Sequence, residues 1–65
     1  MWVKLTITFN RPLSQFERDQ VIAAIGHNGM TVIDEESLVL YHVWRLSVPG
    51  IIRKLSSITE SYKAE

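Results

Sequence analysis

The stretch SLVLYHVWRLSV, residues 37–48, decides the predicted fold. It is long, apolar and rich in β-branched and aromatic residues, which favours a β-strand. A strand with one wet face would alternate cleanly between apolar and polar residues, and this stretch does not. The pattern therefore predicts the central strand of a sheet with apolar contacts on both sides. One face has Leu38, Leu40, His42, Trp44, Leu46 and Val48, and the other has Val39, Tyr41, Val43, Arg45 and Ser47.

The size and composition of the chain limit what it can be. Sixty-five residues predict a single domain, residues 1–65, and a domain of this size buries only roughly 60% of its unfolded surface. The sequence has no cysteine, so disulfides and thiolate metal sites are excluded, and a reducing cytoplasm is the expected location. Seven basic and seven acidic residues cancel, which argues against a domain held on nucleic acid by a strong positive field.

Neither targeting nor membrane insertion is expected from the apolar pattern. The residues after Met1 do not form a charged start followed by an unbroken apolar run, as a signal peptide would. No apolar stretch approaches the ~20 residues of a spanning helix. We therefore expect no membrane partner.

Residues 2–9, WVKLTITF, have the most regular alternation in the chain. Val3, Leu5, Ile7 and Phe9 fall on one side, and the residues on the other side are mostly polar. The pattern predicts a first strand with one apolar face.

A first helix is predicted from Ser14 to about Ile25. Ser14 and Glu17 have the spacing of a capping box, in which each side chain accepts a hydrogen bond from the backbone of the other residue. Gly26 can adopt the left-handed conformation that ends many helices.

The second half of the chain predicts a hairpin and a second helix. Residues 30–33 form a short strand candidate, and the acidic turn 34–36 leads into the long strand. The helix is expected to start near Ser47, with Pro49 in its first turn. Its apolar stripe at helical spacing is Ile51, Leu55, Ile58 and Tyr62, and the tail 63–65 is expected to fray.

The predicted element order is β-α-β-β-α, which resembles the opening five elements of a ferredoxin-like α/β plait. The resemblance implies a small α+β sandwich, a truncated plait with an antiparallel sheet and two helices on one face. The sixth element, an edge strand, is missing, which would leave an open edge beside the first strand. Leu38, Leu40, Trp44 and Leu46 would face the helices, unless a bulge in the long strand swaps part of that assignment.

No motif in the sequence predicts catalysis, a metal or a cofactor. His27 and His42 have no recognised metal-ligand spacing with the acidic residues 34–36. The serines lack the context of a nucleophile elbow, and the glycines fit no phosphate-binding loop. We therefore expect a protein that is not an enzyme and needs no cofactor.

The helix-free face of the sheet is the predicted binding site. An apolar stripe on an otherwise exposed face marks an association site, and tyrosine, tryptophan and arginine are common binding hot spots. We expect a regulator, accessory subunit or small inhibitor that binds another protein and also itself as a homodimer. The predicted partner-binding residues are Tyr41, Val43, Val39, Arg45, Trp2 and Lys4.

A module for single-stranded RNA or DNA is the alternative, with the same sheet face as its site. Single-strand readers built on a plait stack bases on aromatics of the open sheet face, and Trp2 and Tyr41 would suit that role. The zero net charge and the lack of the sequence motif typical of such readers argue against it.

Overall fold

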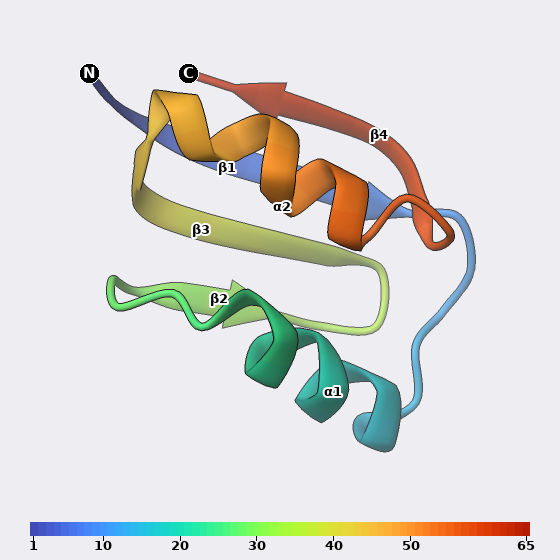
Figure 1. The fold of residues 1–65 in the computed structure, drawn as a ribbon. Helices are drawn as coiled ribbons and strands as arrows, with labels where there is room; N and C mark the ends of the chain where they lie inside the picture. The colour runs from blue at the N-terminus through green and yellow to red at the C-terminus, as the bar shows by residue number, and fades with distance from the viewer.

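The computed structural model describes residues 1–65 as a two-layer α+β sandwich (Figure 1). Four strands form one antiparallel sheet in the order β2-β3-β1-β4, and two helices pack on it. This confirms the predicted class and is consistent with a ferredoxin-like plait. The elements are β1 (Trp2–Phe9), α1 (Gln15–Ile25), β2 (Thr31–Ile33), β3 (Ser37–Trp44), the short 3-10 helix η1 (Arg45–Ser47), α2 (Val48–Lys54) and β4 (Thr59–Ala64).

The predicted absence of a sixth element is wrong, because the C-terminal residues form β4. The second helix was expected to reach Tyr62, but α2 ends at Lys54 and Tyr62 pairs with Ile7 of β1. Ser and Thr compete with helical hydrogen bonds, and the sequence after the helix is rich in both. Pairing with β1 also gives the backbone groups of that strand a partner. The edge beside β1 is therefore closed, and the tail is not frayed up to Ala64.

A β-bulge in β3 overturns part of the predicted side-chain assignment. Val3 pairs with Val43 and Leu5 pairs with Leu40, so two residues of β3 lie opposite Lys4. One of those two residues is His42, whose φ of 57° is left-handed. A bulge turns the residues after it to the other face of the sheet.

Beyond the bulge, the predicted inside and outside of the long strand are exchanged. Val43, expected on the open face, is 2% exposed and belongs to the core. Trp44, expected in the core, is 42% exposed. Leu46 was also expected in the core, but β3 ends at Trp44 and Leu46 is 79% exposed in η1.

The first helix begins and ends as predicted. Ser14 Oγ accepts a hydrogen bond from the Glu17 amide at 3.2 Å, and Glu17 Oε1 accepts one from the Ser14 amide at 3.0 Å. Gly26 caps the C-terminus with φ 61°. Neither α1 nor α2 has the length and apolar content that a membrane span requires.

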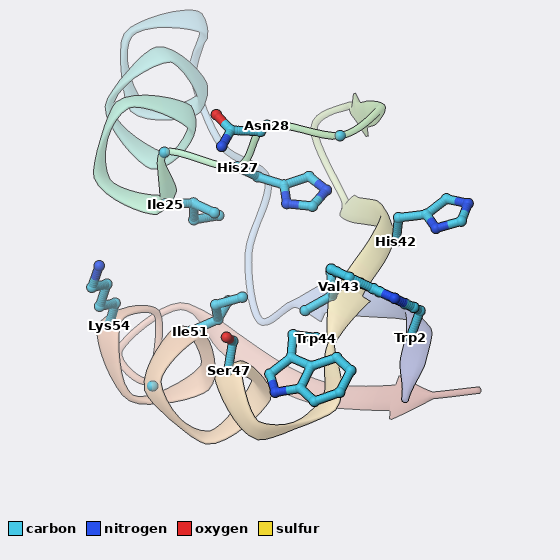
Figure 2. A pocket seen from close by; sticks show the side chains of 13 residues that line it. Trp2, Ile25, His27, Asn28, His42, Val43, Trp44, Ser47, Ile51 and Lys54 are labelled. Carbon is cyan, nitrogen blue, oxygen red and sulfur yellow. The ribbon is translucent and has the colours of Figure 1, made fainter.

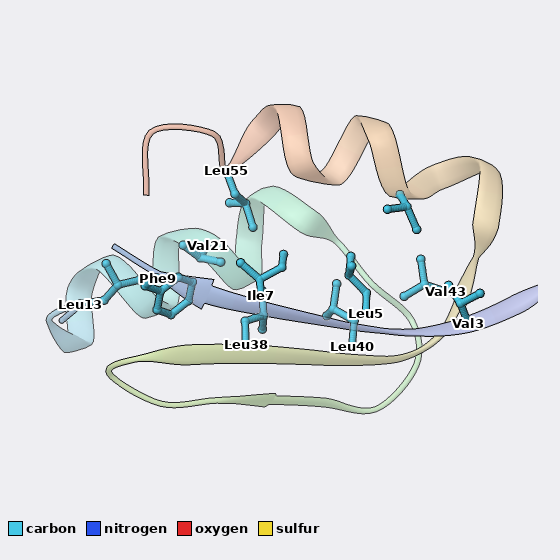
Figure 3. Packing of buried hydrophobic residues seen from close by; sticks show 11 residues of the cluster. Val3, Leu5, Ile7, Phe9, Leu13, Val21, Leu38, Leu40, Val43 and Leu55 are labelled. Carbon is cyan, nitrogen blue, oxygen red and sulfur yellow. The ribbon is translucent and has the colours of Figure 1, made fainter. Parts of the chain in front are cut away.

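The hydrophobic core lies between the helices and one face of the sheet (Figure 3). The predicted apolar face of β1 is buried throughout. Val21 of α1, Val48 of α2 and Leu55 at the end of α2 cover it, so both helices lie on that one face. The buried set is Val3, Leu5, Ile7, Phe9, Leu13, Val21, Leu38, Leu40, Val43, Val48 and Leu55.

Candidate functional site

The open face of the sheet is the side away from the helices. In its middle, Val32 of β2 pairs with Val39 of β3, and Val39 pairs with Thr6 of β1. Thr6 in turn pairs with Lys63 of β4. Val32 is 51% exposed, while Val39 and Thr6 are partly buried by their neighbours. Across the centre of the open face, the two apolar residues Val32 and Val39 are thus followed by Thr6 and then by the charged Lys63.

Aromatic side chains gather where β1 begins and β3 ends. The ring centroids of Trp2 and Trp44 are 5.3 Å apart, and those of Trp2 and His42 are 6.3 Å apart. Lys4 Nζ lies 5.7 Å from the ring centroid of Tyr41, within the range of a cation–π contact. The bulge creates this cluster, because it places His42 and Trp44 outside the core beside Trp2.

A groove of about 700 Å³ opens beside this cluster (Figure 2). Its walls come from the turn after α1, from α2 and from the bulged end of β3. Ile25, Val43 and Ile51 point toward the same space and give it an apolar floor. The lining residues are Trp2, Ile25, Gly26, His27, Asn28, Gly29, His42, Val43, Trp44, Ser47, Gly50, Ile51 and Lys54.

A hydrogen bond fixes the turn that forms one wall of the groove. His27 Nε2 lies 2.6 Å from the carbonyl oxygen of Tyr41. A carbonyl can only accept, so Nε2 is the protonated nitrogen that donates. Gly29 makes this approach possible, since a Cβ there would lie 2.6 Å from His27 Nε2 and 2.7 Å from the Tyr41 oxygen.

The acidic turn of the β2–β3 hairpin lies away from the groove. None of the residues that line the groove is acidic, and Lys54 is among them. The acidic turn 34–36 lies at the other end of the sheet, where the Glu36 carbonyl accepts from the Phe9 amide. Trp2 and Phe9 are the two ends of β1, so the groove and the acidic turn are separated by the length of that strand.

The three groups with shifted pKa values, Arg11, Glu17 and Asp34, take part in capping a helix or a turn, and none of them lines the groove. A hydrogen bond from Arg11 and one from the Ser14 amide lower the pKa of Glu17 to about 2. The same contact with Glu17, at 2.6 Å, raises the pKa of Arg11. The amides of Glu36 and then Ser37 lower the pKa of Asp34, which caps the β2–β3 turn.

The residues considered for a metal site do not converge. His27 and His42 lie at the groove, and the acidic turn lies at the far end of the sheet. No group of three or more histidine, aspartate or glutamate side chains has an arrangement that could hold an ion.

Four of the six predicted binding residues lie together on the open face. These are Trp2 and Lys4 of β1 with Val39 and Tyr41 of β3, and Lys4 contacts Tyr41. Arg45 lies beyond the end of β3, where its Nη1 is 3.7 Å from Met1 Sδ. The prediction that Val43 lies on the binding surface is wrong, because the bulge turns its side chain into the core.

Sequence reasoning missed three residues that complete this end of the molecule. Trp44 and His42 were assigned to the apolar side of the strand, and no pattern related Lys54 to them. One signal was available for the bulge. Histidine tolerates the left-handed conformation better than most residues, and it interrupts an otherwise apolar strand at position 42.

Comparison with known proteins gives no relative from which a function could be inferred. No family model, no curated protein and no solved structure matches the chain.

Proposed function

We propose that this protein is a small non-enzymatic module that binds another protein through the open face of its sheet, as a regulator, accessory subunit or small inhibitor. The supporting observation is the exposed aromatic cluster at the end of that face. Trp2 is 62% exposed and Trp44 42% exposed, and the half-exposed Val32 extends the apolar surface along the sheet. Exposed apolar surface of this kind marks association sites, and tryptophan and tyrosine dominate binding hot spots.

The titratable groups with shifted pKa values support a non-enzymatic reading. Glu17, Arg11 and Asp34 are each engaged in hydrogen bonds that end a helix or hold a turn. Their shifts therefore have a structural cause and none that suggests acid–base chemistry. The proposal includes a cytoplasmic location, in keeping with a chain without cysteine.

The proposal also includes self-association. The sequence suggested pairing through an open edge of the first strand, but that edge is covered by β4. β4 now forms the outer edge of the sheet beside β1, and all its residues except Thr59 are exposed. An exposed edge strand can add a strand from a second copy. Sedimentation at micromolar concentration should then report about twice the chain mass of 7.5 kDa. A sedimenting monomer would remove the homodimer from the proposal.

Binding of single-stranded nucleic acid is the second candidate. Trp2 and Tyr41 lie on the two central strands, where such readers stack bases, and Lys4 lies beside Tyr41. The zero net charge and the contact of Lys63 with Glu65 on the same face weigh against it. Tight binding to generic oligonucleotides that falls steeply with salt would favour this candidate over a protein partner.

The experiment that tests the proposal compares capture of partners from the native host by three proteins, the wild type and two variants. Wild-type protein, the double variant Trp2→Ala/Tyr41→Ala and the control Phe16→Ala are immobilised at equal amounts. Phe16 is a matched control, since it is an aromatic residue on α1 that is 70% exposed. A genuine partner should be retained by the wild type and the control and lost by the double variant. Loss on Phe16→Ala with retention by the double variant would put the functional surface on the helices.

A further inference from the structure

The groove beside Trp2 and Trp44 has the size of a ligand site and an apolar floor. Its volume of about 700 Å³ lies within the range of roughly 300–1,000 Å³ that is usual for ligand sites. The partly exposed Ile25 and Ile51 form an aliphatic floor, and the tryptophan pair lines one end (Figure 2). A bulky apolar side chain that entered the groove would be desolvated on several sides, which is the usual environment of a binding anchor.

The lining of the groove has a positive charge, although the molecule as a whole is neutral. Lys54 is the only residue with a full charge in its lining, and no carboxylate opposes it there. Lys54 Nζ donates to the Ala24 carbonyl at 3.3 Å, which holds the ammonium at the groove while leaving donors free. Arg45 follows directly after Trp44 and adds a second positive charge at this end of the sheet. The field at the groove therefore favours an anionic partner.

Two backbone features form this end of the molecule, and each has a cost. His42 has φ 57°, a conformation that non-glycine residues adopt only where the surroundings require it. Gly29 is the residue that permits the contact between His27 and the Tyr41 carbonyl. Bulges of this kind re-aim side chains next to binding sites. Both features act at the same place, the wall of the groove.

We infer that the groove receives an acidic peptide segment of the partner, with a bulky apolar side chain as anchor. The anchor packs on Ile25 and Ile51 against the tryptophan pair, and a carboxylate of the segment meets Lys54. This inference rests on the proposed function and adds the chemistry of the partner. A nucleic-acid strand fits less well, because the floor is aliphatic and a single lysine in the lining offers little to a run of phosphates.

The experiment uses both tryptophans as reporters. They are the only two in the chain and both line the groove, so the indole fluorescence and the two indole N–H resonances report on the groove and on the aromatic cluster beside it. Four probes are titrated into the full chain. They are a short glutamate-rich peptide with a central leucine, the same peptide with a central alanine, a lysine-rich peptide with a central leucine, and an oligothymidylate.

The expected result is that the acidic leucine peptide shifts both indole resonances at the lowest concentration. The alanine peptide should bind more weakly because it lacks the bulky apolar anchor, and the lysine-rich peptide because it lacks the carboxylates. Lys54→Glu should weaken the acidic peptide roughly tenfold, as an attraction becomes a repulsion. Arg53→Glu is the matched control, since it makes the same charge change on the neighbouring exposed residue outside the groove and should change the affinity little.

Several results would overturn the inference. Equal shifts with the acidic and lysine-rich peptides would show that charge does not contribute to binding. Equal shifts with the leucine and alanine peptides would show that the groove holds no apolar anchor. Shifts with oligothymidylate alone would assign this aromatic end of the molecule to nucleic acid and rule out the acidic peptide. If no probe shifts the indoles while a host partner is still lost on Trp2→Ala/Tyr41→Ala, the acidic-peptide inference fails and the proposed function stands.

Discussion

Trp2 and Trp44 lie directly opposite each other across the β1–β3 ladder, with ring centroids 5.3 Å apart at an interplanar angle of 67°. This is the edge-to-face arrangement that aromatic pairs prefer. Alternation from Leu38 and Leu40 alone would direct Trp44 into the core, on the side opposite to Trp2. The tryptophan pair therefore exists on the surface because of the bulge at His42.

The bulge can be tested by substitution at His42, where φ is 57°. His42→Val should destabilise the fold by roughly 1–3 kcal/mol, since a β-branched residue is strained in that conformation. His42→Gly should leave the free energy of unfolding unchanged or raise it. Urea denaturation of the three proteins measures the difference. A valine variant as stable as the glycine variant would show that the strand has no bulge at this residue.

Leu46 in η1 and Leu55 at the end of α2 test which side chains of this region are in the core. Leu55 is 4% exposed and Leu46 79% exposed, although both were expected in the core. Leu55→Ala should cost roughly 2–5 kcal/mol, which could unfold so small a domain. Leu46→Ala should cost under about 0.5 kcal/mol. Thermal melts compare them, and equal losses would mean that η1 packs into the core.

Acid stability should depend on Glu17. The folded-state pKa of Glu17 is lowered from its ordinary value of 4.5 to about 2, first by the Arg11 hydrogen bond and then by the Ser14 amide. A lowered pKa gives stability that is complete above the unfolded value and is lost as the pH falls from about 4.5 to about 2. Glu17→Gln should therefore flatten this part of the curve of melting temperature against pH. Parallel curves for the two proteins would show that the ion pair contributes nothing, as exposed pairs often do.

Two glycines should respond oppositely to alanine. Gly29→Ala places a Cβ 2.7 Å from the Tyr41 carbonyl oxygen, so the turn must move and the His27 hydrogen bond should break. Gly50 is inside α2 with nothing within 4 Å of the added Cβ. Gly50→Ala should stabilise by roughly 0.5–1 kcal/mol, because alanine favours the helix. Unfolding free energies check both, and a stabilising Gly29→Ala would contradict the packing of the turn.

Local chemistry was sufficient to predict most of the fold. The capping box of Ser14 and Glu17, the glycine cap at Gly26 and the alternation in β1 depend on short-range contacts, and the structure confirms all three. The apolar pattern also predicted Leu55 as a core residue. Periodicity is reliable where one element buries one face against a single layer.

The errors arose where tertiary pairing outweighs local pattern. Tyr62 continues the helical spacing of Ile51 and Leu55, yet the unpaired edge of β1 draws it into a strand. The bulge at His42 inverts the faces of the residues after it, so Val43 and Trp44 were both misplaced. The groove was missed for a further reason. It joins residues from β1, α1, β3, η1 and α2, and no local pattern relates them.

The proposed protein partner binds the open, aromatic end of the sheet. The most direct measurement is a map of ¹H–¹⁵N chemical-shift changes when the captured partner is added to labelled protein. The largest changes are expected at the amides of Lys4, Val39 and Tyr41 and at the indole N–H groups of Trp2 and Trp44. Changes confined to the exposed sides of α1 and α2, with the indoles unmoved, would show that the partner binds the helices instead.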